Sequence, residues 1–146
     1  MNETGACAVV VHGKERALCA YLGASCKYST EHLNTHMDIL RQTKIIYASG
    51  FFITSNPIAL RQIAAFCTEH DKTFAFNLSA LFIIQFTFDE VKNAIEHADF
   101  VFCNEDECDA YGKMVGIMES DRDETAKKLA LQPKTNTKRP RTVIIT

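Results

Sequence analysis

The sequence predicts an α/β domain built on a mostly parallel sheet with helices on both faces. Four short apolar runs, at 45–48, 74–76, 100–102 and 143–145, are separated by segments that carry helix signals. Strands and helices therefore alternate along the chain, which favours βαβ units with right-handed crossovers. Each run is apolar at consecutive positions, as in parallel strands that are buried on both faces.

The segment before these runs is predicted to form a hairpin. Two short β-prone runs, 7–11 and 17–22, flank a charged turn that contains Gly13. By the two-residue period of a strand, one face of the second run carries three apolar side chains, those of Leu18, Ala20 and Leu22. We expect this hairpin to be a separate flap on the α/β domain.

Three helices are predicted between the strands. Asn56 and Pro57 form the N-cap and first-position pattern of a helix, and an apolar stripe follows them. Thr87 is expected to cap the second helix, which has acidic residues in its first turn. Ser120 is expected to cap the third, in which acidic residues come early and lysines late, as the helix dipole favours.

Composition excludes several classes of protein. The chain has 146 residues, 47% of them hydrophobic, and a net charge of -2, so we expect a packed domain that does not bind nucleic acid. No apolar run approaches the ~18 residues of a membrane span, and the first residues do not resemble a signal peptide. We therefore expect neither membrane insertion nor secretion, and we expect the six cysteines to be reduced thiols.

The residues directly after three of the predicted strands are candidates for a site, because ligands in open α/β sheets bind at such positions. These residues are 49–52, 77–80 and 104–107. In the last set, the oxygen atoms of Asn104 and Glu107 could hold a hydrated divalent cation. The same two residues also match the capping box of the helix that follows, and the two roles are compatible.

Other patterns have structural explanations. His32 and His36 share one helical face, but Leu33 stands where a zinc protease needs its glutamate base, so no metal is expected there. The glycines form no phosphate-binding loop. The basic segment 134–141 predicts an exposed loop, with an anion-binding patch as the alternative.

Several segments, taken together, resemble the ribokinase-like family of carbohydrate and nucleoside kinases, and within it the members that phosphorylate adenosine. Each motif alone is modest, but they occur in the same order over nearly the whole chain. The segments are 4–8, 16–22, 48–52, 77–80 with Phe82, 85–86, 104–107 and 131–146. Because members of this family are much longer, the chain is expected to correspond to the middle portion of a kinase.

The resemblance implies a ribokinase-like parallel domain with a small β lid, residues 1–26 belonging to the lid and 27–146 to the domain. It implies transfer of the γ-phosphoryl group of ATP to the 5′-hydroxyl of adenosine with Mg²⁺, by a monomeric, cytoplasmic enzyme of purine salvage, with the nucleus left open as a second location. A related sugar or nucleoside kinase is one alternative. A truncated, non-catalytic binding module that uses the hairpin or the sheet edges is another.

The resemblance also implies roles for individual residues. Arg16, otherwise a solvated turn charge, would contact the transferring phosphate. Phe82, otherwise a core aromatic, would stack on the base, and Tyr111 would lie near the nucleoside. Asn104 and Glu107 would organise the magnesium ion and its waters. The apolar wall of the lid against the purine would consist of Leu18, Ala20 and Leu22.

The chain departs from the family pattern in two respects. Leu81 stands where the resemblance leads us to expect Pro, directly before Phe82. The glycine-rich anion hole and the catalytic Asp of the family would lie beyond Thr146, and the ribose-binding segment would lie before Met1. The isolated chain is therefore expected to be inactive, because the general base is missing.

Overall fold

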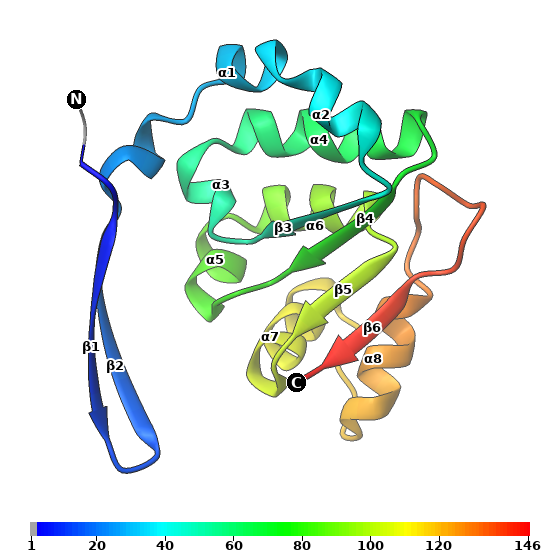
Figure 1. The fold of residues 1–146 in the computed structure, drawn as a ribbon. Coiled ribbons are helices and arrows are strands. Elements are labelled where there is room, and N and C mark those ends of the chain that lie inside the picture. The colour runs from blue at the N-terminus through cyan, green and yellow to red at the C-terminus, as the bar shows by residue number, and fades with distance from the viewer. Residues whose placement is uncertain (1–2) are drawn as a thin grey trace.

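The computed structural model describes residues 3–146, which form a hairpin, a four-stranded parallel sheet and a layer of helices (Figure 1). The elements in chain order are β1 (Ala6–His12), β2 (Glu15–Tyr21), the 3-10 helix η1 (Gly23–Lys27), α1 (Thr30–Thr35), α2 (Met37–Gln42), β3 (Ile45–Ser49), α3 (Phe52–Ser55), α4 (Pro57–Glu69), β4 (Thr73–Asn77), α5 (Leu81–Phe86), α6 (Phe88–His97), β5 (Phe100–Cys103), α7 (Glu105–Val115), α8 (Arg122–Ala130) and β6 (Thr142–Ile145). The predicted α/β fold class is confirmed. Within the described residues, no helix has the length and apolar character needed to cross a bilayer.

The four strands of the sheet lie in the order β3, β4, β5, β6, and each neighbouring pair is parallel. All four coincide with the predicted apolar runs. The register places Ser49, Asn77 and Phe102 side by side on neighbouring strands. The residues that follow the strands are consequently gathered at one edge of the sheet, on the side toward which the arrows in Figure 1 point.

The core lies between the sheet and the helices. Phe74 and Phe76 of β4 are fully buried, and α4 and α6 pack against this strand and against each other. Leu60 of α4 and Val91 of α6 belong to the same buried cluster. Burial of each such side chain contributes roughly 1.5–3 kcal/mol, so this layer holds the strand ends at fixed positions.

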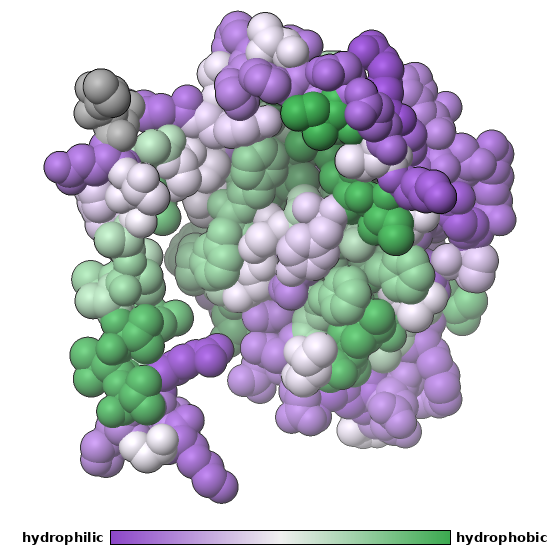
Figure 2. All heavy atoms as spheres, in the orientation of Figure 1, coloured by the Kyte–Doolittle hydropathy of each residue, from purple (hydrophilic) through white to green (hydrophobic). Residues whose placement is uncertain are grey.

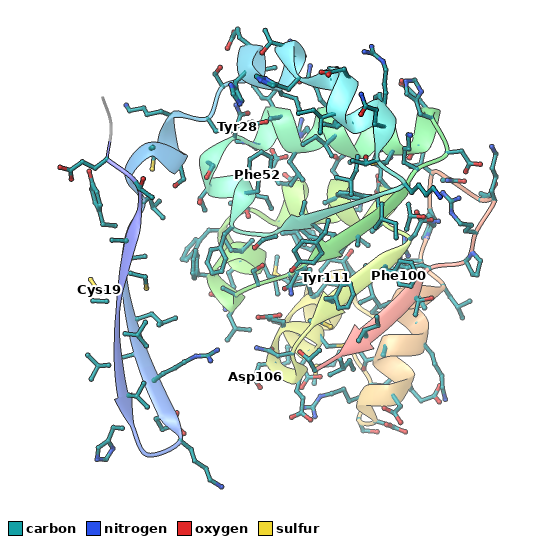
Figure 3. All side chains as sticks on the ribbon, viewed as in Figure 1. Cys19, Tyr28, Phe52, Phe100, Asp106 and Tyr111 are labelled. Atoms are coloured by element: carbon teal, nitrogen blue, oxygen red, sulfur yellow. The ribbon has the colours of Figure 1, made fainter. Side chains whose placement is uncertain are left out.

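The described helices cover one face of the sheet, whereas we predicted that both faces would be covered. The strand order is sequential, and right-handed crossovers between successive neighbours place every connecting helix on the same side. Ile46 and Val143 pack on the core, but Ile45 and Tyr47 are 65% and 57% exposed. Apolar side chains gather over this open face in Figure 2, and Phe100, labelled in Figure 3, lies on it.

Of the caps predicted for the three helices between the strands, the structure confirms one and corrects two. Asn56 caps α4 through its side chain, as predicted. Thr87 stands at the start of α6, but its hydroxyl donates to the carbonyl of Ile83 at 2.6 Å and does not cap the helix. Asp121, not Ser120, caps α8, because its carboxylate accepts a backbone N–H of the first turn and its charge is favourable at a helix N-terminus.

The predicted hairpin is confirmed, and it extends away from the body of the molecule. His12 pairs with Glu15 across a two-residue turn in which Gly13 has a φ of 60°, a value that suits glycine. Every residue of both strands is exposed. The chain rejoins the body at Tyr28, whose ring lies 5.2 Å from that of Phe52. Figure 2 shows open space between the hairpin and the body.

The basic segment 134–141 is a loop, as predicted, but it is only partly exposed. The Lys134 ammonium group is buried against the carboxylate of Asp99, which also lies near Arg139. Arg141 is 5% exposed. Because these charges are used within the fold, the segment does not form an anion-binding patch.

Replacing Arg141 by Met should destabilise the protein by about 3 kcal/mol, because buried acceptors would lose their donors. The guanidinium group of Arg141 donates to four backbone carbonyl groups, those of Ile95, Leu129, Gln132 and Pro133. Lys138→Met is the matched control: the Lys138 side chain is 69% exposed, and its ion pair with Asp71 at the surface contributes little to stability. Urea unfolding measures both variants, and equal losses of stability would contradict the structural role of Arg141.

Candidate active site

A polar pocket of about 500 Å³ opens at the carboxyl ends of the strands, where the topology predicts a ligand site. This polar pocket is lined by residues of β3, β4 and β5, of the segments that follow β3, β4, β5 and β6, and of the hairpin. They are Arg16, Tyr47, Ser49, Phe51, Asn77, Ser79, Cys103, Asn104, Glu107 and Thr146. Three of the predicted site residues, Arg16, Asn104 and Glu107, therefore lie in one place although they are far apart in the sequence.

Asn104 and Glu107 form the predicted capping box at the start of α7. The side-chain oxygen of Asn104 accepts the Glu107 N–H at 2.8 Å, and Oε2 of Glu107 accepts the Asn104 N–H at 3.0 Å. Among the described residues, Oε1 of Glu107 has no hydrogen-bond partner, and the residue lines the polar pocket although it is 5% exposed. The cap therefore leaves one carboxylate oxygen available to a ligand.

These groups fit a hydrated magnesium ion better than a closed metal site. In residues 3–146, no three His, Cys, Asp or Glu side chains are grouped so that they could hold a metal ion. Mg²⁺ keeps several of its waters and is usually bound by one or two carboxylates together with substrate phosphates. Glu107 and Asn104 could supply the protein part of such a site.

Arg16 reaches the polar pocket from the hairpin. It lies at the start of β2, two residues after the Gly13–Lys14 turn, and is exposed. The side chains of Leu18 and Ala20 follow on the same face of β2, since alternate residues of a strand point to one side. Cys19, on the other face, points away from the body in Figure 3.

The three residues predicted to form the apolar wall lie on the hairpin or just after it. Leu18 is 60% exposed and available to a ligand, and Leu22 is 44% exposed just past the end of β2. The pairing register adds two residues that we did not predict, because Val9 lies opposite Leu18 and Cys7 lies opposite Ala20. A two-residue turn at Gly13 and Lys14 fixes which residues of the two strands lie opposite each other, so the turn could have identified these two residues from the sequence.

The residue type of Phe82 alone suggested a core aromatic, but Phe82 does not lie in the core. It is 48% exposed, and its ring centroid lies 6.0 Å from that of Phe51 at an interplanar angle of 50°. Phe51, which is 49% exposed, lies in the predicted ligand-binding segment 49–52, but we predicted no role for it. The two rings follow neighbouring strands and form an apolar surface beside the polar pocket, and we call them the aromatic pair.

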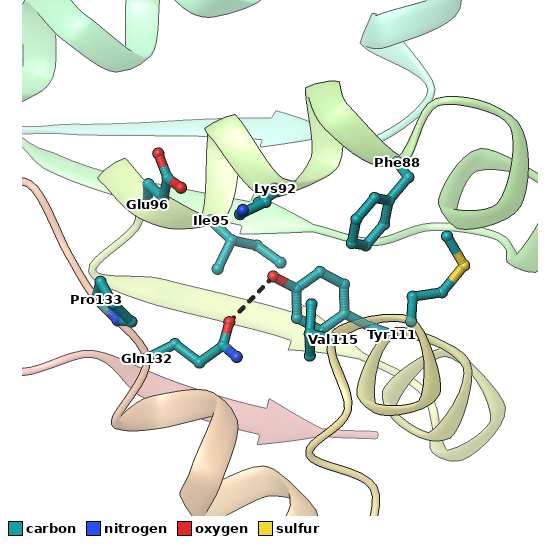
Figure 4. A pocket seen from close by; sticks show the side chains of 9 residues that line it. Phe88, Lys92, Ile95, Glu96, Tyr111, Val115, Gln132 and Pro133 are labelled. Carbon is teal, nitrogen blue, oxygen red and sulfur yellow. Dashed lines mark hydrogen bonds between the residues drawn. The ribbon is translucent and has the colours of Figure 1, made fainter.

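Tyr111 does not belong to this site. It is fully buried, and its hydroxyl donates to Gln132 at 3.3 Å in a second pocket between α6, α7 and the segment after α8 (Figure 4). No residue that lines this second pocket lines the polar pocket. Burial raises the pKa of the Tyr111 phenol to about 12, so it stays neutral at physiological pH. Its position in the interior of α7 makes it a packing residue.

The polar pocket is better suited to positioning charged groups than to covalent catalysis. Cys103 is the thiol that lines it, and a hydrogen bond with the Cys108 sulfur together with burial raises the pKa of Cys103. A neutral thiol is a weak nucleophile. The remaining groups are hydroxyls, amides, one carboxylate and one guanidinium, an arrangement that can bind a phosphate and a hydrated cation.

Comparisons with known proteins agree with this geometry. Residues 2–146 match the model of the pfkB family of carbohydrate kinases. The chain is 37% identical to the adenosine kinase of Dictyostelium discoideum and 37% identical to that of Schizosaccharomyces pombe, over 98% of this chain in both cases. It spans 42% and 43% of the length of these two relatives.

The chain is also similar in structure to solved kinases. The chain superposes with a TM-score of 0.93 on the Anopheles gambiae adenosine kinase in complex with P1,P4-di(adenosine-5) tetraphosphate, at 36% identity, covering 99% of this chain and 43% of that one. It also superposes on a probable sugar kinase from Rhizobium etli with a TM-score of 0.74, covering 89% of this chain and 39% of that one. The identity there is 21%, so this second likeness concerns the fold alone.

Proposed function

The chain belongs to the pfkB family of carbohydrate kinases, and we propose that it is the central part of an adenosine kinase. This enzyme transfers the γ-phosphoryl group of ATP to the 5′-hydroxyl of adenosine. The observation that carries the proposal is the aromatic pair, Phe51 and Phe82, placed beside a polar pocket that contains Arg16 and Glu107. A nucleoside needs an apolar surface for its base and a polar site for the reacting hydroxyl and phosphate.

The open face of the sheet supports a role as part of a larger domain. Parallel sheets are normally covered on both faces, whereas Ile45 and Tyr47 are exposed on the uncovered side. The adenosine kinases of Dictyostelium discoideum and Schizosaccharomyces pombe are more than twice as long as the span they share with this chain. A longer kinase supplies the additional polypeptide that such a face requires.

Each group in the polar pocket has a defined task in phosphoryl transfer, which depends on positioning and charge stabilisation more than on covalent chemistry. Glu107 and Asn104 would hold the magnesium ion, which neutralises charge on the ATP phosphates when bound. Arg16 would meet the transferring phosphoryl group when the hairpin closes over the site, and closure would exclude water. The apolar face of β2 would then cover the base from the side opposite Phe82.

A sugar kinase is the weaker alternative. The exposed groups around the base position are two aromatic rings and the apolar side chains of Leu18, Ala20 and Val9. A polyol would leave its hydroxyl groups unpaired against these surfaces, which is unfavourable. A flat purine would bury apolar area on both of its sides.

The test is product analysis with the full-length kinase that contains this chain. Incubated with Mg²⁺ and ATP labelled at the γ-phosphate, it should convert adenosine to labelled AMP and should transfer little label to ribose or fructose. A preparation from a host that lacks adenosine kinase removes background activity. Equal or faster transfer to the sugars would refute the proposed substrate, and absence of any transfer would favour a binding module.

A further inference from the structure

An unusual backbone conformation lies beside the aromatic pair. Ser79, between β4 and α5, has a φ of 70°, in the left-handed region. Only one other described non-glycine residue has a positive φ: Asp71, which follows α4 and is of a type that tolerates this region. A strained residue persists only where its surroundings hold it, and such residues are concentrated at functional sites.

A set of hydrogen bonds holds Ser79 in this conformation. Its N–H donates to the side-chain oxygen of Asn77 at 2.7 Å. Its hydroxyl lies 2.8 Å from the hydroxyl of Ser49 and accepts the N–H of Gly50 at 3.0 Å. The serine side chain therefore crosses from the end of β4 to the end of β3.

The two loops that meet here carry the two aromatic rings. Ser49 Oγ accepts the N–H of Phe51 at 3.3 Å, and Ser79 lies three residues before Phe82. The backbones also approach closely, since a Cβ atom on Gly50 would lie 2.6 Å from the carbonyl oxygen of Leu78. The bridge from Ser79 to Ser49 and Gly50 thus joins the polypeptide that places one ring to the polypeptide that places the other.

The choice of residue at position 79 indicates that the side chain is used. Glycine adopts a positive φ without steric cost and would suffice for a turn alone. Serine accepts the strain and adds the hydroxyl that contacts β3. The presence of serine at position 79 is therefore explained by its hydroxyl group and not by the turn conformation.

We propose that Ser79 is a positioning residue that fixes the spacing of Phe51 and Phe82 through its hydroxyl, and so sets the affinity for the purine base. The inference rests on the proposed adenosine kinase function. The backbone bond from the Gly50 N–H to the Asn77 carbonyl, 2.7 Å long, would remain, so loss of the Ser79 hydroxyl would shift the loop of Phe51 without releasing it, and the base would lose part of its contact with one ring. Asn104 and Glu107, which would hold the magnesium ion, line the same polar pocket but make no hydrogen bond to the bridge, so ATP binding should change less than adenosine binding.

The test uses Ser79→Ala and Ser79→Gly in the full-length kinase. Adenosine dissociation constants are measured by calorimetry without ATP, and KM values for adenosine and ATP by initial rates. We expect both variants to weaken adenosine binding about 3- to 10-fold, the range for loss of one partly buried hydrogen bond, with the KM for ATP changed less than about twofold. Because Gly removes the strain as well as the hydroxyl, Ser79→Gly should keep its melting temperature.

Two further variants separate positioning from general loss of structure. Ser49→Ala should weaken adenosine binding to a similar extent, and the double variant with Ser79→Ala should bind no more weakly than the weaker single variant, because both remove the hydrogen bond between the two hydroxyl groups. Ser120→Ala, at an exposed serine outside the polar pocket, should leave both ligands unaffected.

The possible failures are distinguishable. If the unmodified kinase does not bind adenosine, the proposed function is refuted. If it binds adenosine and Ser79→Gly binds equally well, the positioning role alone is refuted. A rise in the KM for ATP equal to that for adenosine would also contradict it.

Discussion

Replacing Arg16 by Ala in the full-length kinase should lower the turnover number about 100-fold or more, while adenosine affinity changes less than about threefold. Arg16 is exposed on the hairpin, yet its side chain lines the polar pocket together with Glu107. A guanidinium group that meets the phosphate only on closure stabilises the charge of the transition state and contributes little to nucleoside binding. Turnover and adenosine binding must therefore be measured separately.

Lys14→Ala is the control for this experiment. Lys14 lies in the same hairpin turn and carries the same charge, but it does not line the polar pocket. Its loss should leave turnover within about twofold, as is usual for an exposed side chain away from the site. If Arg16→Ala behaves like Lys14→Ala, Arg16 is a solvated turn residue and the closure of the hairpin has no catalytic role.

Replacing Glu107 by Gln should raise the Mg²⁺ concentration needed for half-maximal rate about 10-fold or more, because a metal-binding carboxylate would be lost. Stability should change little, since Gln also serves at the third position of a capping box and can accept the Asn104 N–H. Magnesium titrations of the rate and urea unfolding separate the two roles of this residue.

Glu105→Gln provides the comparison. Glu105 lies in the same first helical turn, and its side chain is 66% exposed and 3.3 Å from Arg122 in an ion pair. It does not line the polar pocket. Its magnesium titration should match that of the unmodified kinase. A magnesium titration of Glu107→Gln that is also unchanged would show that Glu107 serves only the helix cap.

The strands and the capping box could be predicted from the sequence because local signals determine them. Apolar runs such as Val143 and its neighbours specify strands, and Asn104 and Glu107 have the spacing of the cap itself. The same signals predict where the polar pocket lies, because parallel strands end at one edge of the sheet. Sheet order is not local, so the uncovered face could not be predicted.

The aromatic pair could not be predicted from the sequence. Phe51 and Phe52 are adjacent, but Phe52 packs on the core while Phe51 is exposed at the site, and only the tertiary structure distinguishes them. Tyr111 shows the opposite error, since a resemblance placed it near the nucleoside and the structure buries it in α7. The bridge made by Ser79 depends on a backbone dihedral angle that residue type does not reveal.

The most direct test of the account is the adenosine KM of two phenylalanine variants, Phe82→Ala and Phe86→Ala. Both residues lie on α5, but Phe82 faces Phe51, whereas Phe86 is 81% exposed and outside the polar pocket and the aromatic pair. If a purine stacks on the aromatic pair, Phe82→Ala should raise the KM for adenosine about 10-fold, the usual cost of losing one base–aromatic contact, with the KM for ATP unchanged. Phe86→Ala should leave both values unchanged. Equal adenosine KM values for the two variants would contradict the claim that this surface holds the base.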